Sequence, residues 1–529
     1  MHPDYRGFLL QHCASDCIVD KLEAIMGNGH HFHSLSIPLK RFYVVTIITF
    51  VLLFALTGCS PKTETTEATS DAAATVETTT AEAVEVTYPD TRLTKEDIIY
   101  FIMVDRFADG DTSGNLPDVD KNDLRAFQGG DLQGIIDNLD YIKSTGATAI
   151  WLTPIMENGP NGYHGYWIYD FYKVDPHFGD LETFKELVDK AHEMDLKVVL
   201  DYIVNHTGYD SPWLDDPEKA DWFNPDRKIS NWKDKEEVEL GWLAGLPDLD
   251  QTNPEVSEYF IENALWWIEE TGIDGFRLDT MRHVSKTFWE EFSETIKSEY
   301  PDFFLLGEVW DENAKTLESY HQSGIDSLTN YSLFNGIENA FTTQANMFSL
   351  VNALDKEKAF THPELNAIFI DNHDNSRFAS NNPRMALEYT KQALTFLYSY
   401  PAIPVVYYGT ELGLSGAFDP ENRRFMAWDK VENNDMLAYV KQLAEIRDVY
   451  MEDFVLTYHD KTSIAYELSN GSDKMLVVIN SEEKDKSITF DYSAASLTDY
   501  ETGEALASYD GNTFTETLAP VSVKFYIVN

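Results

Sequence analysis

Residues 197–206 read Lys-Val-Val-Leu-Asp-Tyr-Ile-Val-Asn-His, an apolar run that ends in polar side chains. Such a run is typical of a buried parallel strand whose carboxyl end carries functional groups. The pattern returns at 275–279 as Gly-Phe-Arg-Leu-Asp, at 303–308 as Phe-Phe-Leu-Leu-Gly-Glu, and at 367–374 as Ala-Ile-Phe-Ile-Asp-Asn-His-Asp. These repeats predict one parallel sheet with its polar residues along one edge.

Outside these segments, apolar runs continue to alternate with amphipathic stretches such as 181–194, 256–270 and 385–399. Alternating strands and helices indicate an α/β fold with crossover connections. Eight strands joined by helices predict a (β/α)₈ TIM barrel, whose active site lies at the carboxyl ends of the strands. The predicted strands are 98–104, 148–152, 197–202, 275–278, 303–306, 327–330, 367–370 and 405–408.

The chain has 529 residues, which is enough for the barrel and additional domains. Residues 207–253 are too many for an ordinary loop, and they predict a small inserted domain after the third strand. Short alternating strands after residue 451 predict a C-terminal β-sandwich. The expected order is a signal segment at 1–59, a flexible acidic linker at 60–90, barrel residues 91–206, the insert at 207–253, barrel residues 254–450, and the sandwich at 451–529.

The formal net charge is −50, and an acidic chain of this kind repels nucleic acid and anionic membrane surfaces. We therefore expect no nucleic-acid partner. The three cysteines are Cys13, Cys17 and Cys59, so the folded part is expected to contain no disulfide.

The N-terminal region resembles a bacterial lipoprotein signal. Lys40 and Arg41 precede the apolar run 42–56, and Leu-Thr-Gly-Cys follows at 56–59. The resemblance implies cleavage before Cys59, lipid attachment there, and an extracellular protein that contacts the membrane only through this anchor. An uncleaved anchor is the alternative, although the run is short for a membrane span. Met26 is an alternative start of the chain.

The polar residues that follow the strands include the pair of carboxylates needed to cleave a glycosidic bond. One carboxylate stays ionised and attacks the sugar, while the other protonates the leaving oxygen. A retaining enzyme holds the two about 5–5.5 Å apart. Asp279 and Glu308 follow adjacent predicted strands and suit this spacing. Arg277, two residues before Asp279, is expected to keep the latter ionised.

These segments, together with 148–154, 246–250 and 403–411, resemble the signature regions of the α-amylase family, glycoside hydrolase family 13. The resemblance extends from about residue 97 to residue 529. It implies that Asp279 is the nucleophile, that Glu308 is the general acid/base, and that Asp374 is the third acid, which holds sugar hydroxyls.

The resemblance also implies a set of substrate-binding residues. Tyr166 is expected to stack under the sugar, His164 to contact its 6-hydroxyl, and Asp419 and Arg423 to act on the donor side. The full expected set is His164, Tyr166, His206, Arg277, Arg282, His373, Asp419 and Arg423.

Calcium is the expected cofactor, with one or two ions bound through oxygen ligands. The resemblance implies a first site made by Asn205, Asp248 and the backbone oxygen of His283. A second site resembles one in cyclodextrin glucanotransferases, although Gly114 stands where that pattern often has Asn. The residues expected there are Asp109, Asp111, Asn115, Gly129 and Asp131.

The expected activity is retaining hydrolysis of α-1,4-glucosidic bonds in starch, glycogen or maltooligosaccharides by a monomer. Glucanotransferase, cyclomaltodextrinase and α-glucosidase activities are the alternatives within the family. Ala244 disfavours strong cyclisation, because glucanotransferases carry an aromatic residue four positions before the residue that aligns with Asp248. A non-catalytic carbohydrate-binding surface protein is the alternative of another class.

Overall fold

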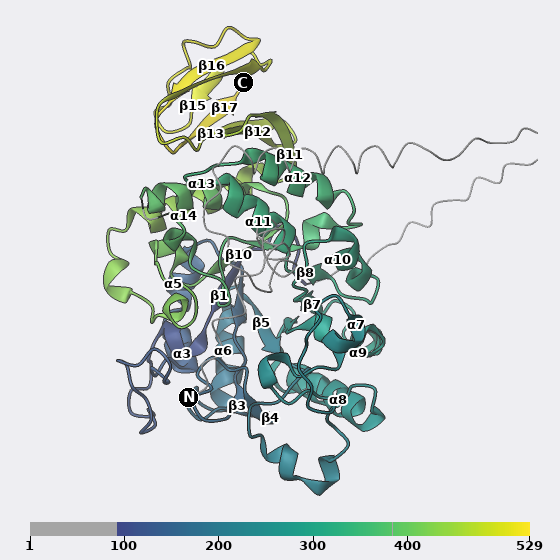
Figure 1. The fold of residues 1–529 in the computed structure, drawn as a ribbon. Helices are drawn as coiled ribbons and strands as arrows, with labels where there is room; N and C mark the ends of the chain where they lie inside the picture. Colours follow the sequence, from purple (N-terminus) through teal and green to yellow (C-terminus); the bar gives the residue numbers. More distant parts are fainter. Residues whose placement is uncertain (1–91, 383) are drawn as a thin grey trace, which may run out of the picture. The chain divides into compact units, whose positions relative to one another are not determined.

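The computed structural model describes residues 92–382 and 384–529, and its central element is a parallel eight-stranded sheet (Figure 1). The strand order is β8-β7-β6-β5-β2-β1-β10-β9. A parallel bridge between Thr329 and Ala367 joins the two ends of this order, so the sheet closes into a barrel. The predicted (β/α)₈ fold is therefore confirmed. The strands are β1 (Ile99–Ile102), β2 (Ala149–Leu152), β5 (Lys197–Tyr202), β6 (Gly275–Leu278), β7 (Phe304–Gly307), β8 (Ser327–Leu328), β9 (Ala367–Phe369) and β10 (Ile403–Tyr407).

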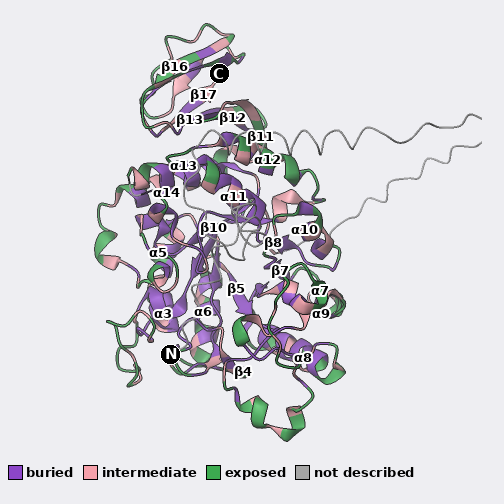
Figure 2. Cartoon of the chain, in the orientation of Figure 1, coloured by how far each residue is buried: buried purple, intermediate pink, exposed green. Residues whose placement is uncertain are grey.

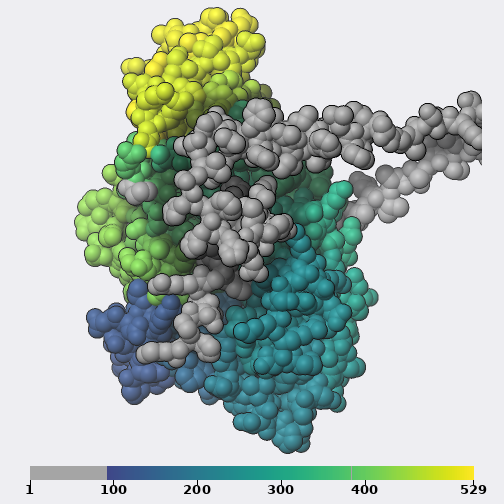
Figure 3. Space-filling view, in the orientation of Figure 1, coloured from purple at the N-terminus to yellow at the C-terminus, as the bar shows by residue number. Residues whose placement is uncertain are grey.

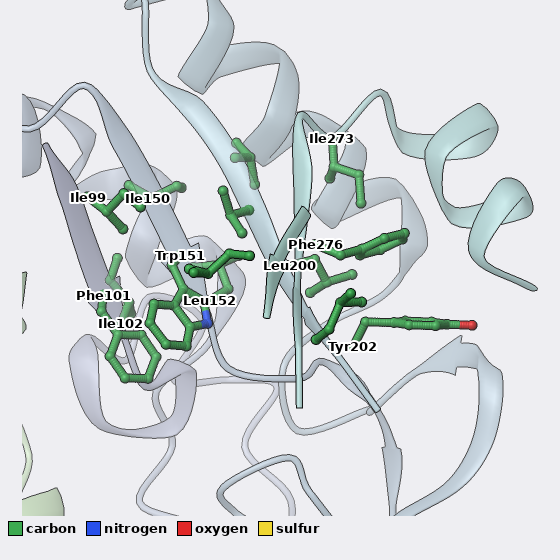
Figure 4. Packing of buried hydrophobic residues seen from close by; sticks show 14 of the residues in the cluster. Ile99, Phe101, Ile102, Ile150, Trp151, Leu152, Leu200, Tyr202, Ile273 and Phe276 are labelled. Carbon is green, nitrogen blue, oxygen red and sulfur yellow. The ribbon is translucent and has the colours of Figure 1, made fainter. Parts of the chain in front are cut away.

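The strands are apolar along their length because helices cover the outside of the barrel and side chains fill its inside. Every residue of β1, β2, β6 and β7 is buried, whereas the outer faces of the helices are exposed (Figure 2). Figure 4 shows the packing of side chains from β1, β2, β5 and β6. Phe101 stacks on Trp151 with ring centroids 3.8 Å apart.

Local sequence signals fix where the helices begin and end. The Asp180 side chain accepts from Thr183 N–H and caps one helix, while Gly272, with φ of 69°, ends another in the left-handed conformation. The barrel helices are α4 (Leu132–Asp137), α5 (Leu139–Ser144), α6 (Leu181–Glu193), α8 (Pro254–Thr271), α9 (Lys286–Glu299), α10 (Ala314–His321), α11 (Tyr331–Ala340), α12 (Met347–Glu357), α13 (Ala386–Ser399) and α14 (Asp435–Tyr450).

The sixth barrel strand is shorter than predicted. The sequence predicted 327–330, but β8 contains only two residues. Asn330 instead caps α11, because its side chain accepts from Leu333 N–H at 3.0 Å. The polar residue that ended the apolar run therefore starts the next helix.

The segment 207–253 leaves β5 and returns at α8 as a predominantly irregular insert with one short α-helix, α7 (Lys235–Glu239). Antiparallel bridges join His206 to Asp248 and Phe223 to Leu249, so the end of the insert lies against its beginning. A hairpin of β3 (Met156–Asn158) and β4 (Ile168–Val174) precedes it.

The C-terminal strands form the predicted antiparallel β-sandwich (Figure 3, yellow). One sheet has the order β11-β12-β13-β17-β15, and β14 pairs with β16 in the other. The strands are β11 (Asp453–His459), β12 (Ser463–Asn470), β13 (Asp473–Asn480), β14 (Lys486–Asp491), β15 (Leu497–Asp499), β16 (Thr513–Leu518) and β17 (Ser522–Val528).

The expected signal segment and the whole expected linker lie outside the described residues, and the domain boundaries stay predictions. Across residues 92–382 and 384–529, we find no helix with the length and apolar character of a membrane span.

Candidate active site

Side chains at the carboxyl ends of β5, β6 and β7 meet at one mouth of the barrel. The strand pairing places Asp201 of β5 beside Arg277 of β6. Asp279 directly follows β6, and Glu308 directly follows the neighbouring strand β7. The backbone therefore brings the two predicted catalytic carboxylates to adjacent strand ends.

One buried guanidinium group binds both of these carboxylates. Arg277 Nη1 lies 2.7 Å from Asp279 Oδ1, and Nη2 lies 2.8 Å from Glu308 Oε1. Nη1 also donates to Asp201 Oδ1 at 2.9 Å. Arg277 is 1% exposed, so these contacts form away from bulk water, where charge–charge attraction is strong. The shared cation holds Asp279 and Glu308 beside one another, as cleavage of a single bond requires.

Burial sets the protonation state of Glu308. It raises the pKa of the Glu308 carboxyl to about 8, against the opposing effect of Arg277 and with the help of the Asp279 charge. Burial also raises the pKa of Asp201 to about 7. A carboxyl group with a raised pKa keeps its proton near neutral pH, which suits Glu308 to the role of general acid.

This assignment predicts an alkaline limb in the pH profile. The free enzyme needs the Glu308 proton, so kcat/KM on a maltooligosaccharide should fall about tenfold per pH unit above about pH 8. Initial rates measured at low substrate concentration from about pH 6 to about pH 10 test this expectation. A profile that stays flat to the alkaline end would contradict the role of Glu308 as acid.

Asp374 lies in a second charged group at the same mouth. Arg423 Nη2 is 3.4 Å from Asp374 Oδ1, and Arg423 Nη1 is 3.3 Å from Asp419 Oδ1. His373 Nε2 lies 3.3 Å from Asp374 Oδ2. Burial raises the pKa of Asp374, with Arg423 acting against it. The structure thus links the predicted third acid to the predicted donor-side pair.

The predicted sugar-binding aromatic residue is held by the same network. The Tyr166 hydroxyl donates a hydrogen bond to Asp201 Oδ2 at 2.7 Å. The Tyr166 ring stacks on the His373 ring with their centroids 5.1 Å apart. Tyr166 N–H donates to His164 Nδ1 at 3.1 Å, and His206 Nε2 lies 3.3 Å from the Tyr166 carbonyl oxygen. Burial lowers the pKa of all three histidines, which are therefore neutral hydrogen-bonding groups at pH 7.

Arg282 makes contacts of a different kind from the other predicted substrate-binding residues. Its Nη1 donates to Trp310 O at 3.2 Å, and its Nη2 donates to Trp232 O at 2.8 Å. These bonds tie the insert to the segment that follows β7. Its role in substrate binding stays a prediction.

The first candidate calcium set brings oxygen atoms together between insert and barrel. In one orientation of the Asn205 amide, its oxygen lies 3.3 Å from Asp248 Oδ1 and 3.0 Å from His283 O. In the reversed orientation, the amide nitrogen donates to both. Three facing oxygen atoms without a proton between them suit a hard cation, so the residues fit calcium. Asp248 is fully buried, and burial raises its pKa well above the ordinary value.

The second candidate set fits less completely. Asn115 Nδ2 donates to Asp109 Oδ2 at 3.0 Å, and the Lys121 ammonium group lies 2.6 Å from the same oxygen. A Cβ atom on Gly129 would lie 2.7 Å from Asn115 Oδ1, which shows how closely these loops approach. In the described part of the chain, Asp109 Oδ1 is buried without a hydrogen-bond partner. Lys121 already supplies a positive charge here.

Asp131 and Asp111 use their carboxylates within the loop. Asp131 accepts from the N–H groups of Gly110, Asp111 and Gly134, and so caps α4. Asp111 Oδ1 accepts from both the N–H and the hydroxyl of Ser113. The structure gives Asp131 a capping role, and its place in a second calcium site stays a prediction.

Metal ligands of the common charged types do not cluster in the described residues. Within 92–382 and 384–529, no group of three or more His, Cys, Asp or Glu side chains is arranged to hold a metal ion. The first candidate set is of another type, because an amide and a backbone carbonyl supply two of its oxygens.

Two residues at the mouth were missed by the sequence analysis. Thr280 contacts both catalytic carboxylates, and its position next to Asp279 was the available signal. Tyr331 follows the short strand β8, and its ring stacks on the Trp310 ring with their centroids 4.9 Å apart. In the described part of the chain its buried hydroxyl has no hydrogen-bond partner of good geometry. No sequence signal pointed to Tyr331.

Comparison with known proteins agrees with this geometry. The family model described as alpha amylase, catalytic domain, matches residues 101–450. The chain belongs to the α-amylase family. As a member of this family it is a glycoside hydrolase, so the resemblance and the enzyme class are confirmed.

Individual relatives of this α-amylase family member cover different shares of its length. The crystal structure of an Anoxybacillus α-amylase is 43% identical, covers 83% of this chain and 98% of its own, and has a TM-score of 0.77. The cyclomaltodextrinase of Thermoanaerobacter pseudethanolicus is 33% identical over 421 residues, which are 75% of this chain and 72% of that protein. The beta/alpha-amylase of Paenibacillus polymyxa is 34% identical over 459 residues, and this chain spans only 37% of its length.

The comparisons correct the predicted location. The intracellular maltogenic amylase of Bacillus subtilis is 34% identical over 377 residues, which are 67% of this chain and 62% of that protein. The prediction of an extracellular, lipid-anchored protein is therefore wrong. It depended on a short apolar run before Cys59, and this residue lies outside the described part of the chain.

Proposed function

We propose that this chain hydrolyses α-1,4-glucosidic bonds of starch, glycogen or maltooligosaccharides with retention of the anomeric configuration. The observation that carries the proposal is the pair of carboxylates, Asp279 and Glu308, bound by the one guanidinium group of Arg277. Two carboxylates held this close leave no room for a water molecule on the far side of the sugar, as an inverting enzyme needs. The geometry therefore favours a covalent intermediate.

In the first step, an oxygen of the Asp279 carboxylate attacks the anomeric carbon, and the bond to the leaving oxygen breaks. Glu308 gives its proton to that oxygen. In the second step, ionised Glu308 takes a proton from water, the water oxygen bonds to the anomeric carbon, and Asp279 leaves. In the first step Asp279 loses its negative charge and Glu308 gains one, and the second step reverses this. Arg277 contacts both groups and stabilises whichever one is ionised.

The surrounding groups bind and orient the sugar. Asp374 would accept hydrogen bonds from sugar hydroxyls, and its contacts with Arg423 and His373 support this role. Neutral His206 and His373 supply further polar contacts, and the Tyr166 ring offers an apolar face beside them.

Product analysis tests this function. Purified protein incubated with soluble starch should release reducing ends, and proton NMR should show the α-anomer forming first. Maltoheptaose as substrate then reports the preferred chain length. An intact protein that binds starch without releasing reducing ends would instead favour the non-catalytic alternative.

Cyclomaltodextrinase activity is the second candidate. The similarity to the cyclomaltodextrinase of Thermoanaerobacter pseudethanolicus favours it. Rapid opening of β-cyclodextrin, compared with starch at equal mass, would identify this activity. Cyclisation is disfavoured, because Ala244 stands in place of the aromatic residue expected of a glucanotransferase and adopts a positive φ of 55°.

We propose that a calcium ion binds Asn205, Asp248 and the His283 carbonyl. When bound, the ion would join the insert to the loop after β6 and neutralise the buried Asp248 carboxylate. The facing oxygen atoms and the complete burial of Asp248 support this proposal. The chain is further proposed to act as a monomer, which light scattering tests.

Calcium should stabilise the protein measurably. A ligand present at 100 times its Kd raises the free energy of unfolding by about 2.7 kcal/mol. Metal-stripped protein should therefore melt at a lower temperature than protein with added calcium, and Asp248→Asn should lose most of this difference. Calorimetric titration that detects no calcium binding to stripped wild-type protein would remove the site.

A further inference from the structure

Thr280 adopts a backbone conformation that its side chain disfavours. Its φ is 46° and its ψ is 39°, in the left-handed region. A branched Cβ in this region crowds the backbone, so a β-branched residue there is strained. Strain of this kind persists only where the surroundings hold it in place, and it gathers at functional sites. Thr280 is only partly buried, so core packing is not what requires a threonine.

The strained residue donates one hydrogen bond to each catalytic carboxylate. Thr280 N–H donates to Glu308 Oε2 at 2.9 Å, and the Thr280 hydroxyl donates to Asp279 Oδ2 at 3.0 Å. Arg277 binds the other oxygen of each carboxylate, Asp279 Oδ1 and Glu308 Oε1. Each carboxylate is therefore held by two donors, one from Arg277 and one from Thr280.

Arg277 and Thr280 approach the two carboxylates from different parts of the chain. Arg277 supplies charge from inside the barrel, whereas Thr280 lies in the chain between the two strand ends. The next residue, Met281, donates its N–H to the Glu308 carbonyl oxygen at 3.0 Å. Two consecutive N–H groups of this turn thus bind Glu308. The left-handed turn directs the Thr280 amide to Glu308 and leaves its hydroxyl beside Asp279.

We propose that Thr280 is a positioning residue that fixes the orientation of the nucleophile relative to the general acid. The hydroxyl keeps the Asp279 carboxylate from rotating, so that Oδ2 points at the anomeric carbon. In the strained turn, one residue reaches both carboxylates. This inference rests on the proposed retaining mechanism.

The test uses two substrates that differ in their need for the acid. Maltotriose requires a proton on its leaving oxygen, whereas α-maltosyl fluoride loses fluoride ion without one. Both require attack by Asp279. The initial burst of fluoride release measures this attack, and steady-state rates on maltotriose measure the whole reaction.

Thr280→Val keeps the branched shape and removes the hydroxyl. It should slow both the fluoride burst and kcat on maltotriose about 10- to 100-fold while KM changes less than about threefold. Thr280→Ser restores the hydroxyl and should recover both rates to within about threefold of wild type. Glu308→Gln should lose turnover of maltotriose while keeping the burst.

Thr390→Val serves as the matched control, because it removes the hydroxyl of a buried threonine on α13, where the group donates to Ala386 O one helical turn earlier. If Thr280→Val does not fold, Thr280→Ala takes its place and carries the same expectation. A normal fluoride burst in the variant lacking the hydroxyl would overturn the inference, and so would a serine variant as slow as the valine variant. A wild-type protein inactive on both substrates would instead contradict the proposed function.

Discussion

Asp279→Asn is expected to lower kcat on starch by on the order of 10⁴-fold or more while the protein keeps its fold. The amide has the shape of the carboxylate but does not attack the anomeric carbon, so the covalent step is lost. The 2.7 Å contact of Arg277 with Asp279 Oδ1 can be kept through the amide oxygen. Reducing-end assays and a thermal melt of the same preparation measure the two quantities.

The matched control for this variant is Asp201→Asn. Asp201 binds the same guanidinium group and also accepts from the Tyr166 hydroxyl, but it is fully buried, whereas Asp279 and Glu308 are each 5% exposed. It should lose activity to a smaller extent than Asp279→Asn. If the Asp279 variant kept more than about one tenth of wild-type turnover, Asp279 would not be the nucleophile.

Arg277→Met is expected to destabilise the protein by about 3–5 kcal/mol, in addition to abolishing activity. The change leaves the Asp279 carboxylate, and those of Asp201 and Glu308 wherever the pH ionises them, buried without their shared cation. An unpaired buried carboxylate is far more costly than the loss of a surface contact, since neither water nor a counter-ion replaces the partner. Urea denaturation at pH 7 measures the difference in the free energy of unfolding.

The loss of stability in Arg277→Met should depend on pH and be smaller at acidic pH. As the pH falls, the orphaned carboxylates take up protons and no longer need a cation, so the destabilisation should shrink toward acid. Arg125→Met is the surface control, because Arg125 is exposed and pairs with Asp419 at 3.2 Å. It should change stability by less than about 1 kcal/mol. A similarly small loss for Arg277→Met would contradict the role of Arg277 as the common partner.

The barrel was predictable because its strands are apolar on both faces and end in polar residues. The run 197–206 marked both β5 and the position of Asp201. The convergence of Arg277, Asp279 and Glu308 followed from the topology, because parallel strands in a closed barrel share one carboxyl edge. These features depend on chain order and residue type alone.

Other features depend on side-chain geometry, which a one-dimensional pattern does not contain. The left-handed turn at Thr280 has no marker in the sequence, since glycine is the usual signal for that conformation. The Asp131 carboxylate accepts from three backbone N–H groups, and this capping role had no marker in the sequence, whereas its predicted role as a calcium ligand stays a prediction. The lipoprotein-like segment was misleading because a short apolar run beside a cysteine is a weak signal of location.

The proposed mechanism requires a covalent bond between the sugar and Asp279. A slow substrate, such as a 5-fluoro α-glycosyl fluoride, should accumulate this intermediate, because fluorine next to the ring oxygen slows its hydrolysis more than its formation. Proteolysis and mass spectrometry of the trapped protein then locate the label. We predict that the label lies on Asp279 in the wild type and is absent from Asp279→Asn. A label on Glu308 or Asp374, or active enzyme that never carries one, would contradict the central claim.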